Sequence, residues 1–312
     1  MSKNDPPNIV YHYTSPQGAF DILRNKTLWF TDCQYLNDMS EFVYILEPIE
    51  EAYTKLTQER GENASDIDRF LKSFFSSPYE GLDFEGFMKH KKMRRGFPPR
   101  FRYYVLCSSI NDDSASMWNY YVRNGSYRGY NLGLRRAIII DWFHQLNNDK
   151  IKLVEGRVIY DRKKQVDKAY QKLKELLACY DNKMVGLGGN ADDSLVIDDF
   201  QDGLSEYIHE QKLFSKNPAF ASEQEHRFVL KVHNDYSNGI SGLQTQYRVG
   251  ESGIITPYIE WNFGDLKAQL LNQITLSPMI ESELAHESFK RFLANDVYQS
   301  IEIKPSTIKL RY

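Results

Sequence analysis

Two segments near the start of the chain place one imidazole among several aromatic rings. Residues 11–15 read Tyr-His-Tyr-Thr-Ser, a composition typical of a short strand. An apolar run over 19–23 indicates a helix, and residues 28–32, Leu-Trp-Phe-Thr-Asp, indicate a second strand. In this order the three elements would bring His12 and Trp29 to one ligand site. Plain core packing is the alternative for each ring, because 14% of the residues are aromatic.

A second segment whose residue types could carry out chemistry is 220–228, Phe-Ala-Ser-Glu-Gln-Glu-His-Arg-Phe. Side chains alternate across a strand, so a strand here would put Glu223, Glu225 and Arg227 on one side and Phe228 on the other. Two carboxylates and a guanidinium would then share a surface. The alternative is a weak ion pair on an exposed face.

A third segment, residues 89–102, concentrates positive charge around Phe97 and Phe101 and contains no acidic residue. Cations interleaved with aromatic rings can follow phosphates and stack on bases, so the segment predicts a nucleic-acid contact. The alternative is a solvated loop. The cations are Lys89, Lys91, Lys92, Arg94, Arg95, Arg100 and Arg102.

Composition excludes several classes of protein. With 39 basic and 42 acidic residues among 312, the overall charge attracts neither nucleic acid nor an anionic membrane. The longest apolar stretch, 137–140, is too short to span a bilayer, and no signal peptide is apparent, so we expect a cytoplasmic protein. Three widely spaced cysteines, Cys33, Cys107 and Cys179, favour neither disulfides nor zinc, and no metal-binding motif occurs.

The order of elements predicts an α+β fold with a mostly antiparallel or split sheet, since the regular alternation of a doubly wound sheet is missing. We expect a single domain over 1–312, with a helical insertion at 163–213 on either side of a glycine-rich break. Strands are predicted at 102–107, 129–134, 152–160, 226–232, 254–258 and 274–276, and helices at 45–56, 66–75, 165–179, 194–213 and 282–294.

These segments together resemble an uncharacterised bacterial family. Its members carry YHYTS, LWFTD, LND with a following Glu, MW with a nearby Tyr, and E-x-E-x-R. The corresponding residues here are 11–15, 28–32, 36–38 with Glu41, 117–118 with Tyr121, and 223–227. The order of the pieces also resembles the ADP-ribosyltransferase superfamily of the diphtheria-toxin and poly-ADP-ribose-polymerase branch, which has a histidine on the first strand and a glutamate on a later one.

The second resemblance implies a split-sheet ADP-ribosyltransferase fold, NAD as substrate and no metal. By the same resemblance, Glu225 would stabilise the ribosyl cation and Glu223 would orient or deprotonate the acceptor. His12 would hold the adenosine ribose, while the backbone at Tyr13 and Thr14 would hold the carboxamide. Trp29, with Tyr35 or Tyr121, would sandwich the nicotinamide. The aromatic strand here carries Trp29 and Phe30 where that superfamily has a tyrosine.

The functional expectation is an NAD-dependent ADP-ribosyltransferase toxin. It would modify a macromolecule such as RNA or single-stranded DNA, in stress or phage defence, and an antitoxin or chaperone protein is an expected partner. Two alternatives stay open. One is an NAD glycohydrolase, in which water replaces the acceptor, and the other is a nonenzymatic protein that binds nucleic acid or a partner.

Overall fold

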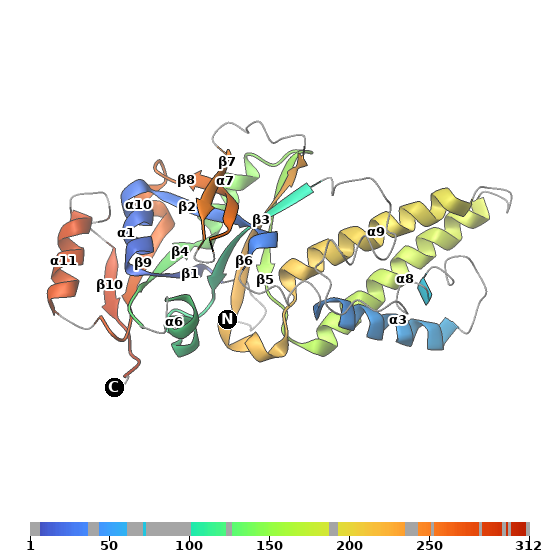
Figure 1. The fold of residues 1–312 in the computed structure, drawn as a ribbon, viewed down its shortest axis with the longest axis horizontal. Coiled ribbons are helices and arrows are strands. Elements are labelled where there is room, and N and C mark those ends of the chain that lie inside the picture. Colours follow the sequence, from blue (N-terminus) through green and yellow to red (C-terminus); the bar gives the residue numbers. More distant parts are fainter. Residues whose placement is uncertain are drawn as a thin grey trace. The chain divides into compact units, whose positions relative to one another are not determined.

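The structure is a computed structural model that describes residues 7–36, 44–60, 71–72, 101–122, 127–186, 193–234, 243–250, 253–280, 283–294, 298 and 301–309. The chain divides into two compact units, and Figure 1 shows their elements. Unit 1 comprises residues 1–36, 99–157 and 222–312, and unit 2 comprises 37–98 and 158–221. The insertion expected at 163–213 lies within unit 2, which also takes in the earlier segment 37–98.

Unit 1 is built on one sheet, in which ten strands are described. Their order is β10-β9-β4-β1-β3-β2-β8-β7, with β6 on β3 and β5 on β6. The only described parallel pair is β9 with β10, and the other described pairs are antiparallel. The expected α+β class and largely antiparallel sheet are thus confirmed. The strands are β1 (Ile9–Thr14), β2 (Thr27–Asp32), β3 (Phe101–Ser109), β4 (Tyr130–Arg135), β5 (Ile151–Arg157), β6 (Glu225–His233), β7 (Thr245–Val249), β8 (Ile255–Asn262), β9 (Leu271–Leu276) and β10 (Glu302–Pro305).

The sheet has two unlike faces because side chains alternate along each strand. One face, here called the core face, carries Phe30, Leu106, Leu132 and Phe228, all at most 2% exposed. Apolar residues of four helices pack into this core. These helices are α1 (Pro16–Asn25), α7 (Arg136–His144), α10 (Lys267–Leu270) and α11 (Glu283–Ala294).

The opposite face, here called the α6 face, is packed by the short helix α6 (Ala115–Tyr121). Met117 and Trp118 of α6 are buried with Tyr13 of β1, and the rings of Tyr13 and Trp118 meet edge to face at 4.6 Å. The faces are assigned from register: Tyr11 pairs with Ser109, and Ser109 pairs with Glu225, so these three residues share the α6 face.

Helix α1 shows how local sequence sets the two ends of an element. Ser15 caps the start, since its hydroxyl accepts a hydrogen bond from the Gly18 amide at 3.1 Å, and Pro16 occupies the first turn. Lys26 ends the helix in the left-handed conformation, with φ of 59°, and its amide donates to the Ile22 carbonyl at 2.8 Å. The chain can therefore enter β2 directly at Thr27.

Unit 2 is helical in its described part. It contains α3 (Leu46–Arg60), α8 (Arg162–Gly186) and α9 (Asp193–Phe214), which Figure 1 shows lying alongside one another. Ile49, Leu173 and Leu204, one from each helix, are completely buried in their shared core. The expected helices at 45–56, 165–179 and 194–213 are confirmed. Most of the helix expected at 66–75 lies outside the described residues, and the two described there, 71–72, are helical.

Within the described part of the chain, no helix combines the length and the apolar character that crossing a bilayer requires.

Candidate active site

Strand β3 is the centre of the candidate site because two strands diverge along one of its edges. On that edge β2 pairs with β3 at Val105, and β1 pairs with it at Ser109. Between these two points no strand pairing on this edge is described. The other edge of β3 is paired with β6 over its full length. Cys107 therefore lies where the sheet splits.

His12 of β1 reaches β3 at this split, although strand alternation directs its side chain to the core face, opposite to the face that carries Tyr11 and Glu225. Its Nδ1 lies 3.0 Å from the backbone carbonyl oxygen of Cys107. A carbonyl can only accept, so Nδ1 carries the proton. Burial lowers the pKa of His12, and the hydrogen bond to Cys107 only partly opposes this effect. The neutral ring therefore has Nε2 as a hydrogen-bond acceptor.

Glu225 and Arg227 form an ion pair on the α6 face of β6. Arg227 donates from Nε to Oε2 of Glu225 at 2.7 Å and from Nη2 to Oε1 at 3.1 Å. The side chains of both residues are at most 2% exposed. The expectation that they share one side of a strand is confirmed, and the alternative of an exposed surface pair is wrong. Arg227 pairs in register with Cys107, so the ion pair adjoins the split.

Glu223 is buried, as Glu225 is, but it does not lie on the expected strand. It ends a short 3-10 helix, Pro218–Glu223, and β6 begins only at Glu225. The residue between them, Gln224, has a φ of 47°, a left-handed conformation that interrupts the strand. The Ser109 hydroxyl donates to the Glu223 carbonyl at 2.8 Å and holds this turn in place. The prediction that strand alternation aligns Glu223 with Glu225 is therefore wrong, although both residues are buried.

Tyr121, the last residue of α6, interacts electrostatically with both Glu225 and Glu223. Its pKa is raised, first by burial and then by the negative charges of Glu225 and Glu223, while Arg227 acts in the opposite direction. Cys107 also interacts electrostatically with the Tyr121 phenol. The structure thus brings Tyr121 together with both predicted catalytic glutamates.

Tyr13 has a structural role in this arrangement. Its hydroxyl donates to the Asn111 carbonyl at 2.8 Å and accepts from the Ser114 amide at 3.0 Å. Burial raises its pKa, so the phenol stays protonated. Thr14 ends β1 opposite Tyr130, and its carbonyl lies so close to Gly129 that an added Cβ there would approach it to 2.5 Å. Tyr13 thus contacts both ends of the 111–114 segment through its hydroxyl.

Trp29 and Tyr35 are more exposed than the other predicted ligand-binding residues, at 39% each. Trp29 lies on the α6 face of β2, two residues from Thr31, which pairs with Val105 of β3. Its indole Nε1 donates to Glu260 of β8 at 3.0 Å. Tyr35 lies on the 3-10 helix Cys33–Tyr35 that follows β2. No described contact joins either ring to Glu225.

The predicted nucleic-acid-binding cations lie almost entirely beyond the structural description. Arg102, on β3, is exposed. The other six, Lys89, Lys91, Lys92, Arg94, Arg95 and Arg100, lie outside the described residues.

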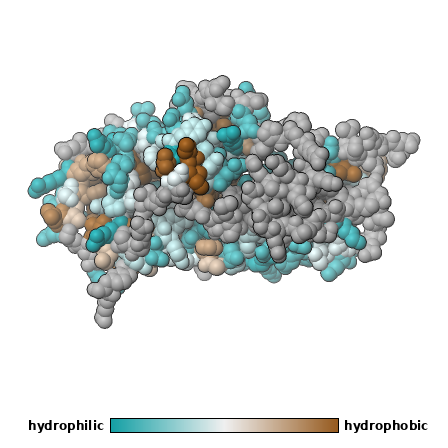
Figure 2. All heavy atoms as spheres, in the orientation of Figure 1, coloured by the Kyte–Doolittle hydropathy of each residue, from teal (hydrophilic) through white to brown (hydrophobic). Residues whose placement is uncertain are grey.

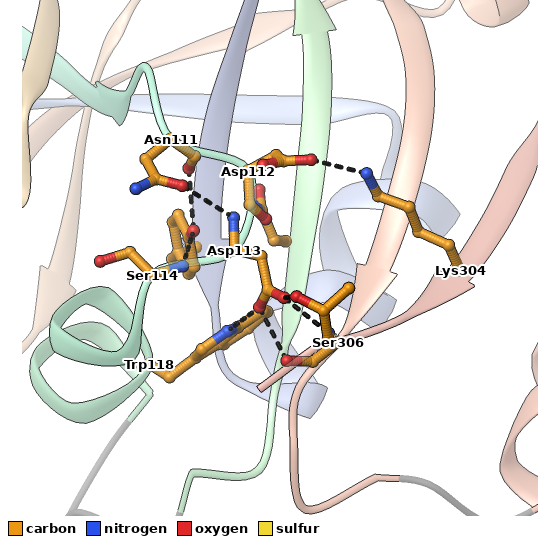
Figure 3. A network of polar contacts seen from close by, with 10 residues as sticks. Asn111, Asp112, Asp113, Ser114, Trp118, Lys304 and Ser306 are labelled. Carbon is orange, nitrogen blue, oxygen red and sulfur yellow. Dashed lines mark hydrogen bonds and ion pairs between the residues drawn. The ribbon is translucent and has the colours of Figure 1, made fainter. Parts of the chain in front are cut away.

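A polar network beside the site was missed by the sequence analysis. Figure 3 shows Asp113 accepting hydrogen bonds from Trp118 Nε1 at 2.8 Å and from the Ser306 hydroxyl at 2.7 Å. The amide and hydroxyl of Thr307 also donate to it, at 2.7 and 2.8 Å. Burial alone would raise the pKa of Asp113, but these hydrogen bonds outweigh it and the pKa is lowered. The neighbouring Asp112 pairs with Lys304 at 2.6 Å.

This network ties the segment before α6 to β10 and to the two residues that directly follow it. The short polar string 111–114 directly before α6 is a signal that could have revealed it, because Asx side chains commonly cap turns and helix starts. Here the Asp113 amide donates to the Asn111 side chain at 3.1 Å, in such a turn. Two partners of Asp113, Ser306 and Thr307, are 193 and 194 residues away and have no comparable sequence signal.

A second missed cluster lies on the core face. His226 Nε2 is 2.6 Å from Glu155 Oε2, and Arg136 Nε donates to the same oxygen at 3.0 Å. Arg136 also contacts Oε1 of Glu155. Burial would raise the pKa of Glu155, but its two partners lower it to about 2. This cluster is separated from Glu225 by the sheet itself, since residues 225 and 226 point to opposite faces.

Among the described residues, no three His, Cys, Asp or Glu side chains form a metal-binding group.

Comparison with known proteins adds one finding. Residues 117–228 match a family model described as a protein of unknown function, DUF2971. The match runs from α6 to β6 and so includes Tyr121, Glu223, Glu225 and Arg227, whereas His12 and Trp29 precede it. No curated protein and no solved structure matches the chain.

Proposed function

We propose that this protein is an NAD-dependent ADP-ribosyltransferase whose reaction centre is Glu225. One observation carries the proposal: the buried Glu225–Arg227 ion pair adjoins the point where β1 and β2 diverge on β3. The charges of Glu225 and Glu223 also act on the Tyr121 phenol. His12 reaches the backbone of β3 at the same split from the core face of the sheet. The sequence resemblance to ADP-ribosyltransferases supports the assignment of roles.

The reaction would break the bond between ribose C1′ and the nicotinamide nitrogen, and the electron pair would leave with nicotinamide. Positive charge then develops on the ribose, as it does in glycoside hydrolysis. An ionised carboxylate fixed beneath the sugar stabilises that charge, and preorganised groups of this kind contribute about 3 to 4 kcal/mol. Arg227 fixes both oxygens of Glu225 with two charge-assisted hydrogen bonds.

The remaining groups have complementary roles in the proposal. Glu223 would take the proton from the acceptor nucleophile as that nucleophile bonds to C1′. Neutral His12 would accept a hydrogen bond from a ribose hydroxyl through Nε2. Tyr121, whose phenol interacts electrostatically with Glu225, is a better candidate than Trp29 to stack on nicotinamide.

Burial sets a condition on substrate entry. Glu225 is 2% exposed, so a ribose can reach it only if side chains around the carboxylate move. Tyr121, whose phenol interacts electrostatically with Glu225, is the last residue of α6 and is the side chain that we expect to move. We expect substrate binding to displace the Tyr121 side chain.

The acceptor in this proposal is a nucleic acid, approached through the cations at 89–100. Support for this part comes from their charge and spacing in the sequence. A role as a toxin in stress or phage defence, held in check by an antitoxin, follows from the enzyme class. Changing Lys91, Lys92, Arg94 and Arg95 to serine should reduce both the affinity for single strands and its salt dependence.

Label transfer tests the proposed function. The full chain is incubated with NAD labelled on the adenylate and with a cell extract, and RNA, DNA and protein fractions are counted separately. Label in the nucleic-acid fraction supports the proposal. Nicotinamide release without label transfer would indicate an NAD glycohydrolase. If neither nicotinamide nor a labelled macromolecule forms, the protein would be a nonenzymatic binding protein.

A further inference from the structure

Trp29 is the most exposed tryptophan of the chain. Its exposed fraction is 39%, whereas Trp118 and Trp261 are fully buried and Trp142 is partly buried in the core. The hydrogen bond from its indole Nε1 to Glu260, at 3.0 Å, fixes the orientation of the ring. An exposed aromatic plane with a fixed orientation binds a flat ligand at a low entropic cost.

Two side chains complete a platform around this indole. Tyr258 packs against it with 4.6 Å between ring centroids and a 39° angle between ring planes. The guanidinium carbon of Arg248 lies 5.2 Å from the Trp29 ring centroid and 6.0 Å from that of Tyr258. Arg248 also donates to the Thr31 hydroxyl at 3.1 Å, which keeps its charge beside the rings.

The position of the platform favours a long ligand. It is built from β2, β8 and β7, and β7 is the last strand in the described sheet order. Trp29 and Thr31 are on the α6 face, the face that also carries Glu225. Hydrophobic residues gather over the β7–β8 hairpin in Figure 2, where Val249 and Ile255 are 73% and 62% exposed. A strand crossing the platform could continue along the same face toward β3.

We propose that Trp29 and Arg248 form a binding site for a nucleobase that carries a phosphate. The base stacks on the exposed part of the indole, and Arg248 pairs with the phosphate. The Glu260 carboxylate accepts the indole N–H, and Arg248 supplies the positive charge beside the two rings. The role of this site as the acceptor subsite rests on the proposed function. Its binding of a nucleobase with a phosphate can be measured without any reaction.

A nucleobase with a phosphate can come from a single-stranded nucleic acid or from a free nucleotide. We assign the platform to a single strand, because stacked aromatic rings with nearby cations are the usual means of holding one. The two sources are separated by comparing a fluorescein-labelled oligothymidylate with AMP. Neither titration contains NAD, so the outcome is independent of nicotinamide release.

The test uses the full chain and three variants. Oligonucleotide affinity is measured by fluorescence anisotropy for the wild type, Trp29→Leu, Arg248→Gln and the matched control Trp142→Phe. AMP binding is followed by quenching of tryptophan fluorescence, which Trp29→Leu should abolish. We expect Trp29→Leu to weaken oligonucleotide binding about tenfold. Arg248→Gln should weaken binding and lower its salt dependence, and Trp142→Phe should leave it unchanged.

Each outcome decides the proposal. Weaker oligonucleotide binding in both platform variants supports it. Quenching by AMP without oligonucleotide binding would assign the platform to free nucleotides and overturn its assignment to the acceptor strand. Equal affinity of Trp29→Leu and the wild type, or no binding of either ligand, would overturn it entirely. Thermal melting confirms that each variant is folded.

Discussion

Arg227 donates two hydrogen bonds, of 2.7 and 3.1 Å, to Glu225 in a site from which solvent is almost completely excluded. Removing one member of such a pair leaves the other charge buried without compensation. Arg227→Met should therefore lower the free energy of unfolding by about 3 to 5 kcal/mol. Urea unfolding followed by tryptophan fluorescence measures this change.

The control for Arg227→Met is an ion pair with greater exposure. Lys304 and Asp112 have side chains that are 32% and 41% exposed, so Lys304→Met should cost about 1 kcal/mol or less. The double variant Glu225→Leu/Arg227→Met should recover much of the lost stability, because no unpaired charge remains. Equal costs for Arg227→Met and Lys304→Met would contradict a buried ion pair.

Glu155 predicts a pH dependence of stability. Its contacts with His226 and Arg136 lower its pKa from 4.5 to about 2 in the folded chain. A depressed carboxyl pKa stabilises the fold fully above 4.5, and this stabilisation is lost as the pH falls toward 2. Glu155→Gln should cost about 1.5 to 3 kcal/mol at pH 7 and clearly less at pH 3. A cost that does not change between these pH values would argue against the ion pair.

Asp113 should anchor the segment 301–309. Asparagine cannot accept the same four hydrogen bonds, so Asp113→Asn should destabilise the chain by about 1 to 3 kcal/mol. Hydrogen exchange should increase specifically at Thr307, whose amide donates to Asp113. Asp141→Asn, at an exposed position on α7, is the matched control and should change neither measurement. Unchanged exchange at Thr307 in Asp113→Asn would refute the anchoring role.

Gln224 offers a test of backbone strain beside the two glutamates. A non-glycine residue in the left-handed region costs about 1 to 2 kcal/mol, which glycine avoids. Gln224→Gly should therefore be more stable than Gln224→Ala by about 1 kcal/mol, as thermal unfolding would show. If alanine were equally stable, the 47° φ of Gln224 would not represent strain.

The parts of the site that sequence reasoning predicted depend on local periodicity. The spacing of Glu225 and Arg227 placed them on one side of a strand, and the structure confirms it. Their burial was not predictable, because helix α6, which packs on this face of the sheet, lies about 100 residues earlier in the chain. The position of Glu223 was mispredicted because the left-handed turn at Gln224 carries no glycine or asparagine to signal it.

Polar contacts between residues far apart in the sequence could not be predicted either. The sequence shows Asp113 and Glu155 only as ordinary acidic residues, and their partners lie on other elements. His12 illustrates an intermediate case. Its strand was predicted correctly, but its contact with Cys107 exists only because β1 and β2 diverge along β3.

The most direct test of the central claim is nicotinamide release from NAD by the purified full chain, compared between the wild type and Glu225→Gln. Glu155→Gln, which removes a partly buried carboxylate on the opposite face of the sheet, is the matched control. We predict release by the wild type and by Glu155→Gln, and a loss of two to three decades in rate for Glu225→Gln. Release by folded Glu225→Gln at the wild-type rate, or no release by the wild type, would contradict the assignment of Glu225 as the reaction centre.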